Sequence, residues 1–196
     1  MKFQKSKLLL VVCLVVVFMS VMLTGCGSSD SSSASSDSSS DSSAAAPAAG
    51  TKAFEDAKSG IKFNYPEGWK LEESSVEGMI AAYANQDPTN LFTFNLITSK
   101  NEANGDFSAY GKQMEEALKS QLDNGKILSN KSVKVAGCDG VKIEYTGEIS
   151  GLKMKNSTLI FGKDKNMFVL TVAGTESGYD KNAADMKNLE KSISLK

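Results

Sequence analysis

The stretch GIKFNYPEGWKLEE, residues 60–73, alternates apolar and polar side chains and then contains a proline, a glycine and a tryptophan. Apolar side chains occupy every second position from Ile61 to Tyr65, which is the period of a half-buried β-strand. Pro66 fixes its own φ angle and Gly68 permits a tight reversal, so the strand ends there. Trp69 follows at once and brings a large apolar surface back toward the interior. The stretch therefore predicts a strand, a turn and a return of the chain to a hydrophobic core.

The two-residue period continues downstream. Residues 91–98 place Phe92, Phe94 and Leu96 on one face and polar side chains such as Thr93 and Asn95 on the other, which predicts a strand with one solvent-facing side. Further runs of this period lie at residues 79–84, 133–135, 141–145, 159–161 and 168–172. The sequences GCDG (137–140) and KDKN (163–166) are turn signals. The second half of the chain therefore reads as a series of antiparallel hairpins.

Two segments change to a helical period. The first carries a stripe at Phe107, Tyr110, Met114, Leu118 and Leu122. Asp106 can cap this helix and Gly125 can terminate it. The second carries a stripe at Tyr179, Ala183, Met186, Leu189 or Glu190, and Ile193. Runs of strands separated from helices favour an α+β fold, in which helices pack on a central antiparallel sheet.

These segments carry a family resemblance. With residues 60–73, the stretches YANQDPTNLFTFNLIT (83–98), DFSAYGKQMEEAL (106–118), VKVAGCDGVKIEYT (133–146) and YDKNAADMKNLEKSIS (179–194) resemble the PsbP-like fold. That fold is known from an extrinsic photosystem II subunit and from small bacterial lipoproteins. The resemblance spans nearly all of residues 54–195. It implies a central antiparallel sheet covered by helices, and accessory or binding roles more than catalysis. The metal-linked behaviour of the photosystem members partly involves histidine, which this chain lacks, so it is not carried over.

The N-terminus reads as a targeting signal. Lysines at positions 2, 5 and 7 precede an apolar run of 16 residues, Leu8 to Leu23, interrupted only by Ser20. The tetrad Leu23-Thr24-Gly25-Cys26 resembles the lipobox of bacterial lipoproteins. This resemblance implies a signal peptide over residues 1–25, cleavage between Gly25 and Cys26, and lipidation of Cys26, so that acyl chains anchor the protein to a membrane. An uncleaved signal anchor is the alternative.

A linker separates this signal from the folded domain. Residues 27–50 contain 12 Ser and 6 Ala, with no aromatic or β-branched residue. Such a segment buries too little apolar surface to offset the entropy of ordering, so residues 26–50 are predicted to form a disordered tether behind the lipidated cysteine. Its typical span is roughly 25–30 Å for a flexible chain. Residues 51–196 are predicted to form one PsbP-like α+β domain.

Charge and composition exclude several partners. Every basic residue is lysine, and residues 26–196 hold 19 lysines against 23 acidic residues, a net charge of −4. Arginine is the preferred group for bidentate capture of phosphate or guanine, so a nucleic-acid partner is not expected. The absence of histidine removes the commonest general base and metal ligand. We therefore expect no catalytic residue, no metal site and no cofactor.

The remaining candidate residues have simpler interpretations. Four serines lie near lysines and leave a histidine-free hydrolase open, at Ser120, Ser129, Ser157 and Ser192. Cys138 is a lone thiol that we interpret as a small hydrophobe. Acidic residues cluster at Glu72, Glu73, Glu77, Glu115 and Glu116, and are interpreted as solvated. Four aromatic side chains that could line a groove are interpreted as core, at Tyr65, Trp69, Tyr83 and Tyr110.

Taken together, these features predict a lipid-anchored protein on the extracytoplasmic face of the cell membrane. We expect a non-enzymatic binding or accessory module whose partner is an envelope protein or a wall polymer. A small-ligand or metal-binding lipoprotein is the alternative, and a histidine-free hydrolase is a minor one.

Overall fold

The structure, a computed structural model, describes residues 49–72, 76–85, 87, 89–101, 103, 105–121, 123–149 and 151–196. The chain divides into two units, Met1–Ala48 and Ala49–Lys196, and the description below concerns the second. The predicted signal peptide, Cys26 and most of the predicted linker lie outside the described residues.

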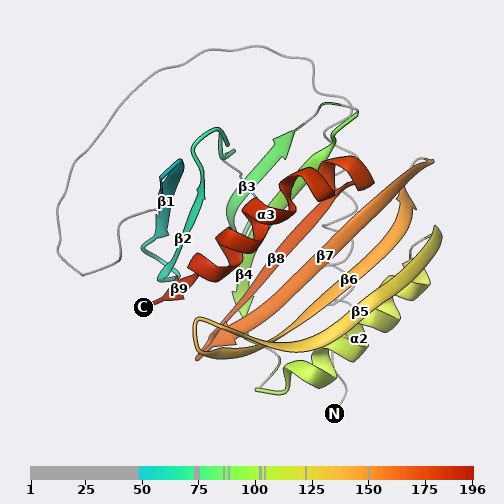
Figure 1. Cartoon of the computed structure of the whole chain (residues 1–196). Helices are drawn as coiled ribbons and strands as arrows, with labels where there is room; N and C mark the ends of the chain where they lie inside the picture. The colour runs from blue at the N-terminus through green and yellow to red at the C-terminus, as the bar shows by residue number, and fades with distance from the viewer. Residues whose placement is uncertain are drawn as a thin grey trace. The chain divides into compact units, whose positions relative to one another are not determined.

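The larger of two sheets is antiparallel throughout. It contains β3 (Met79–Asn85), β4 (Phe92–Lys100), β5 (Asp123–Val135), β6 (Cys138–Ile149), β7 (Leu152–Lys163) and β8 (Asn166–Thr175). Its strand order is β3-β4-β8-β7-β6-β5. Strands β5 to β8 follow one another as hairpins, as the sequence predicts, and β4 pairs with β8 along nine consecutive residue pairs. Figure 1 shows these strands side by side.

The smaller sheet joins the two ends of the domain. It contains β1 (Thr51–Asp56), β2 (Ile61–Pro66) and β9 (Ser194–Leu195), with β2 in the middle. Strand β2 ends at Pro66, as predicted, and the Trp69 backbone N–H donates to the Pro66 carbonyl at 3.0 Å. Trp69 then enters the core, where its ring stacks on Tyr83 with centroids 4.6 Å apart.

Two helices pack on opposite faces of the larger sheet (Figure 1). Helix α2 (Phe107–Gln121) packs on β5 and β6, where Gly111 lies against the Val141 side chain. Helix α3 (Glu176–Ser192) packs on β2, β8, β7 and β4, and its Glu190 binds Lys142. Val141 and Lys142 are neighbours on β6, so their side chains point to opposite faces, and the two helices lie on those two faces. This arrangement confirms the predicted α+β class.

The main core lies between the larger sheet, α3 and the smaller sheet. It is formed by the apolar face of β4 with facing residues of β7 and β8, chiefly Phe92, Phe94, Leu96, Phe161, Phe168 and Leu170. Met186 and Leu189 of α3 and Phe63 of β2 close it. A second apolar layer lies under α2, where Tyr110, Met114 and Leu118 are buried as their spacing predicts. Each fully buried side chain of this size contributes about 1.5–3 kcal/mol.

Several local predictions need correction. Asp106 caps α2 through a bond from the Ala109 N–H at 2.9 Å, as predicted, but the helix ends at Gln121 and Gly125 lies inside β5. The nearby left-handed residue is Asn124, with φ of 50°. The hairpin before β6 turns at Ala136 and Gly137, both with positive φ, so the turn includes the first residue of GCDG and begins one residue before it. Ala183 is exposed rather than part of the buried stripe of α3.

Candidate functional site

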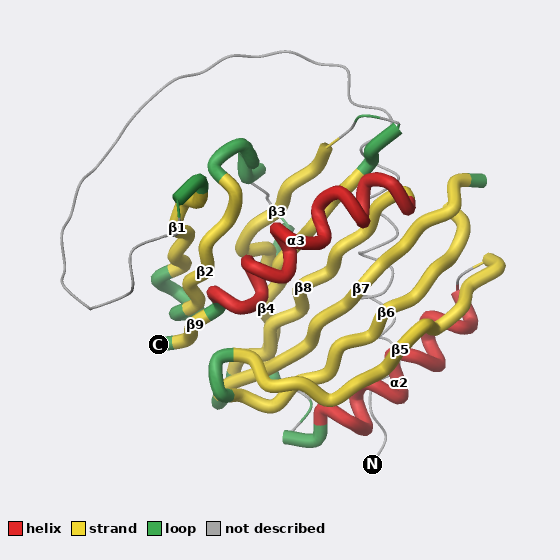
Figure 2. Tube along the Cα trace, viewed as in Figure 1, coloured by secondary structure: helices red, strands yellow, loops and turns green. Residues whose placement is uncertain are grey.

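The candidate site is a polar surface on the α3 side of the larger sheet. Helix α3 crosses one part of this face, and Figure 2 shows β6 and β5 beyond it toward the edge of the sheet. Lys142 of β6 faces this side because it reaches α3, so Glu144, Thr146 and Glu148 of the same strand face it too. We call these residues, with Ser129, Lys153, Lys155, Glu176, Asp180 and Glu190, the polar surface.

One end of the polar surface is hollowed into a pocket of ≈ 420 Å³. Its lining comes from β5, β6, β7 and the first residue of α3: Asn124, Thr146, Gly147, Glu148, Lys153, Met154, Lys155 and Glu176. The volume lies within the usual range for small-molecule sites. Two lysines and two glutamates leave the lining without net charge. The pocket is therefore suited to groups that carry both charges or neither.

Lys155 is held in place at the wall of this pocket. Its Nζ lies 2.6 Å from Asp180 Oδ1 of α3 and 5.0 Å from the centre of the Tyr179 ring. The hydrogen bond to Asp180 raises the pKa of Lys155 above its usual value. The ammonium group thus stays charged, with its position fixed by α3.

A second ion pair joins the sheet to the far end of α3. Lys142 Nζ lies 2.8 Å from both carboxylate oxygens of Glu190, and both side chains are half-buried. Beside it, the Ser129 hydroxyl donates to Glu144 Oε2 at 2.7 Å. Ion pairs near both ends of α3 therefore hold this helix on strands β6 and β7 of the polar surface.

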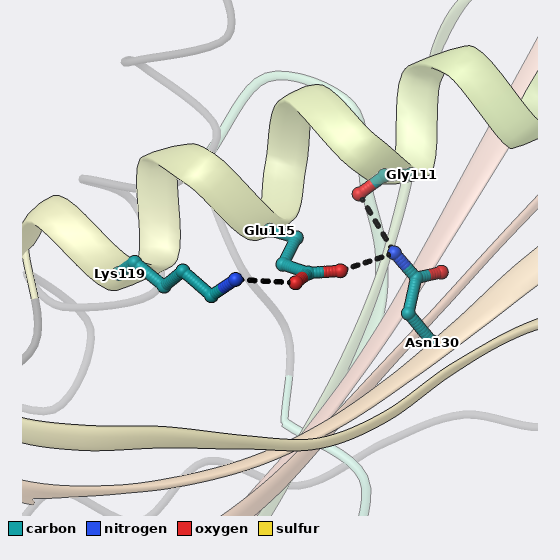
Figure 3. A network of polar contacts seen from close by, with 4 residues as sticks. All are labelled: Gly111, Glu115, Lys119 and Asn130. Atoms are coloured by element: carbon teal, nitrogen blue, oxygen red, sulfur yellow. Dashed lines mark hydrogen bonds and ion pairs between the residues drawn. The ribbon is translucent and has the colours of Figure 1, made fainter.

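The α2 face carries a separate polar network, shown in Figure 3. Asn130 of β5 donates to Glu115 Oε2 at 2.8 Å and to the Gly111 carbonyl at 3.3 Å. Lys119 donates to Glu115 Oε1 at 2.6 Å. The hydrogen bonds from Lys119 and Asn130 lower the pKa of Glu115. This network holds α2 on β5, which gives Glu115 a structural role.

Three of the four serines considered for a hydrolase donate to oxygen atoms. Ser120 donates to the Ala117 carbonyl at 2.8 Å, and Ser129 donates to a carboxylate as described above. Ser192 donates to the Leu189 carbonyl at 2.8 Å and accepts from the Asn64 N–H at 2.7 Å. Ser157 is buried in the sheet. The structure gives none of these four hydroxyls a lysine amine as a hydrogen-bond partner within the described residues.

The other candidates are dispersed. Cys138 is half-buried at the start of β6, with its sulfur 3.8 Å from the Ala136 carbonyl oxygen. Glu72 forms an isolated bridge with Ala82, and Glu73 lies outside the described residues. Within the described part of the chain, no three His, Cys, Asp or Glu side chains are placed to hold a metal ion. Trp69 and Tyr110 are buried, and Tyr65 and Tyr83 pack partly buried against the core.

Sequence reasoning did not single out the pocket. Lys153 and Lys155 are two residues apart on one strand, so they share a face, and this spacing was the available signal. These lysines lie near Glu148 and Glu176 because β6 pairs with β7 and because α3 begins beside them. A local sequence pattern predicts neither the strand pairing nor the position of the helix.

The model of the PsbP family matches residues 49–195. The chain belongs to the PsbP family. The PsbP-like fold expected from the sequence motifs is thereby confirmed, and it extends over the whole of the described domain. No curated protein matches the chain in sequence.

Solved structures share this PsbP-family fold. The cyanobacterial PsbP of Synechocystis sp. PCC 6803 aligns with a TM-score of 0.55 at 13% identity, over 80% of this chain and 98% of that chain. LpqN of Mycobacterium tuberculosis, described as involved in cell envelope biogenesis, aligns with a TM-score of 0.56 at 15% identity, over 74% and 90%. PA94 of Pseudomonas aeruginosa, a protein of unknown function, aligns with a TM-score of 0.56 at 11% identity, over 74% and 97%. At these identities the similarity concerns the fold alone.

No helix among the described residues is long and apolar enough to cross a membrane.

Proposed function

We propose that this PsbP-family protein is a lipid-tethered binding or accessory module on the extracytoplasmic face of the cell membrane. Acyl chains on Cys26 anchor it, residues 27–50 act as a spacer, and the domain binds an envelope protein or a wall polymer. The lipobox, the serine-rich segment and the family membership support this proposal. LpqN, which is described as involved in cell envelope biogenesis, has the same fold.

The observation that carries the proposal is the position of the polar surface relative to β1, the first strand of the domain. The serine-rich segment leads directly into β1, which is an edge strand of the smaller sheet. The polar surface is built on β5, β6 and β7, at the other end of the larger sheet from β3. In Figure 1, β1 and β5 lie on opposite sides of α3. The strand that follows the serine-rich segment and the polar surface thus lie at different edges of the domain, so a tether attached before β1 leaves the polar surface free for a partner.

The chemistry of this surface suits a polar partner. Lysines and carboxylates alternate with hydroxyl groups, and the charges that face α3 are already paired. Exposed ion pairs contribute little binding energy but set orientation and specificity. We therefore expect recognition through hydrogen bonds and charge pattern rather than through a large apolar contact.

Site-specific photocrosslinking on intact cells tests this proposal. A photoreactive residue replaces Lys153 in the pocket, and the matched control replaces Lys58, an exposed lysine in the β1–β2 turn. We expect an adduct with a defined partner from position 153 and none from position 58. Adducts from position 58 alone would contradict the proposed surface, and no adduct from either position would contradict the accessory role.

A small-ligand role is the second candidate, and the pocket volume favours it. Its balanced lysines and glutamates suit a zwitterion such as a free amino acid. Calorimetric titration with alanine would then release heat that the variant Lys153→Gln loses. An equal signal from the wild type and this variant would exclude the pocket as the ligand site.

A further inference from the structure

Strand β5 forms one open edge of the larger sheet. It is the last strand in the order β3-β4-β8-β7-β6-β5, and among the described residues only β6 pairs with it. Figure 2 shows β5 at this border of the sheet. The opposite edge is partly occupied, because the Glu72 N–H donates to the Ala82 carbonyl of β3 at 2.8 Å. The edge strands β1 and β9 of the smaller sheet have 6 and 2 residues, against 13 in β5. The outer edge of β5 is therefore the longest open edge within the described part of the chain.

The second half of β5 is regular enough to accept another strand. From Ser129 to Val135 its residues pair with β6 without interruption, and both register shifts of β5 lie before Ser129. Bulges discourage pairing at the edge of a sheet, and here they are confined to the first half of the strand. Lys131, Ser132 and Lys134 are all exposed, although side chains alternate between the two faces of the sheet. Neither helix therefore covers this half of β5.

The turn after β5 determines which backbone groups point outward. Residues 136–137 both have positive φ and form a two-residue hairpin turn, so Val135 and Cys138 on either side of it are a hydrogen-bonded pair. Hydrogen-bonded and non-hydrogen-bonded pairs alternate along an antiparallel ladder. Every second residue back from Val135 therefore directs its N–H and C=O groups to β6. The residues between them, Ser132 and Lys134, direct theirs away from the sheet.

The charge of β5 indicates the chemistry of a partner strand. The strand carries three lysines and one acidic residue, Asp123, whereas the chain as a whole has a net charge of −1. Lys134 pairs with Asp139 at 2.7 Å, and the structure gives Lys126 and Lys131 no ion pair within the described residues. A second copy of β5 would bring identical lysines together along one seam, and like charges on neighbouring strands are unfavourable. A strand that carries carboxylates fits this edge better than another copy of the chain does.

We propose that the outer edge of β5 binds an extended, acidic segment of a partner protein as an additional β-strand. The N–H and C=O groups of Ser132 and Lys134 bond to the backbone of this segment, and its carboxylates lie beside Lys131 and Lys126. In such strand addition the main-chain hydrogen bonds provide affinity and the side chains provide specificity. Residues 130–134 belong neither to the pocket nor to the polar surface, so this inference does not rest on the function proposed above.

Amide hydrogen exchange of the protein with a synthetic peptide tests this inference. The probe is an acetylated and amidated heptapeptide of alternating threonine and glutamate, and exchange is followed by NMR. The Ser132 and Lys134 amides should exchange freely in the protein alone and about tenfold or more slowly with saturating peptide, because they gain hydrogen bonds. The Lys131 and Val133 amides should be protected in both samples, because they bond to β6. Attraction between charges alone would leave the exchange of Ser132 and Lys134 unchanged.

Two comparison peptides and three variants complete the test. Lysine in place of every glutamate, or proline in place of every threonine, should weaken binding by about tenfold or more. Ser132→Pro removes one outward N–H and leaves the pairing with β6 in place, so it should fold and bind about tenfold more weakly. Lys131→Gln keeps the backbone and should bind about twofold to fivefold more weakly, which corresponds to one exposed ion pair. Lys58→Gln, in the β1–β2 turn, should bind like the wild type.

Four results would overturn the proposal. They are absence of binding, equal binding of the lysine peptide, binding that leaves the Ser132 and Lys134 amides unprotected, and protection of these two amides in the protein alone. Lys131→Gln tests the assigned charge independently of the proline variant, and an unchanged affinity in Lys131→Gln would contradict an acidic partner.

Discussion

The substitution Thr171→Val should stabilise the protein. Valine has nearly the shape of threonine, and Thr171 has an exposed fraction of 1% in the middle of the larger sheet. Its hydroxyl oxygen has no hydrogen-bond partner. The native state therefore bears the desolvation cost of this group without a compensating bond, which is about 1–3 kcal/mol. Removing the hydroxyl should raise the free energy of unfolding by an amount in that range.

The neighbouring Thr158 is the matched control. It pairs directly with Thr171 across β7 and β8 and has an exposed fraction of 4%. Its hydroxyl oxygen, however, is not among the buried atoms without a partner, and Thr158 interacts with the Tyr145 hydroxyl. Thr158→Val removes this interaction from the buried tyrosine, so it should lower the free energy of unfolding by about 1–2 kcal/mol. The same chemical change at adjacent positions should thus have opposite signs.

Urea denaturation of the wild-type protein and of both variants measures this difference. The midpoint concentration should rise for Thr171→Val and fall for Thr158→Val, with unchanged slopes. Thermal midpoints should follow, at about 2–4 °C per kcal/mol for a domain near this size. A loss of stability in Thr171→Val as large as that in Thr158→Val would show that the Thr171 hydroxyl has a hydrogen-bond partner in the folded protein, contrary to this prediction.

Three further predictions concern packing and charge. Gly178→Ala should lower the free energy of unfolding by about 2–3 kcal/mol, because a Cβ there would lie 2.2 Å from the Leu91 carbonyl oxygen. Gly68→Ala is the control and should be nearly neutral in the same denaturation assay, because no atom lies within 4 Å of a Cβ at that position. Asn130→Ala should raise the pKa of Glu115, measured by carboxyl NMR titration, because it removes one of the hydrogen bonds that lower it. The pKa of Glu115 is lowered in the folded state, so its stabilising contribution is present above the unfolded-state pKa and is lost as the pH falls through the folded-state pKa. In Asn130→Ala, the free energy of unfolding should therefore fall less over this acid range than in the wild type. An unchanged Glu115 titration in the variant would contradict the network in Figure 3.

Strands with one apolar face could be predicted from the sequence. The alternation from Ile61 to Tyr65 corresponds to β2, and that of Phe92, Phe94 and Leu96 corresponds to β4, because each strand buries one face in the main core. The stripe of α2 could be predicted for the same reason. In each case the spacing of the apolar residues in the sequence corresponds to the side chains that are buried.

Other features depend on pairing between distant segments. The pairing of β4 with β8 brings Asn95 beside Thr171. Asn95 is buried there, although the alternation of its strand predicts that it faces solvent. The sequence predicts that Gly125 terminates α2, because glycine commonly ends helices, but the helix ends at Gln121. The residue with the left-handed conformation is Asn124. The polar residues of the pocket are exposed or half-buried, so no apolar period marks them in the sequence.

The intact mass of the protein extracted from its native membrane is the most direct test of the central claim that this domain is lipid-tethered. We expect a mature chain that begins at Cys26 and carries a diacylglycerol-based modification on that residue. In the variant Cys26→Ala this mass should be absent and the signal peptide should be retained. A wild-type protein that starts at Met1, or one that starts elsewhere without a lipid, would contradict the account.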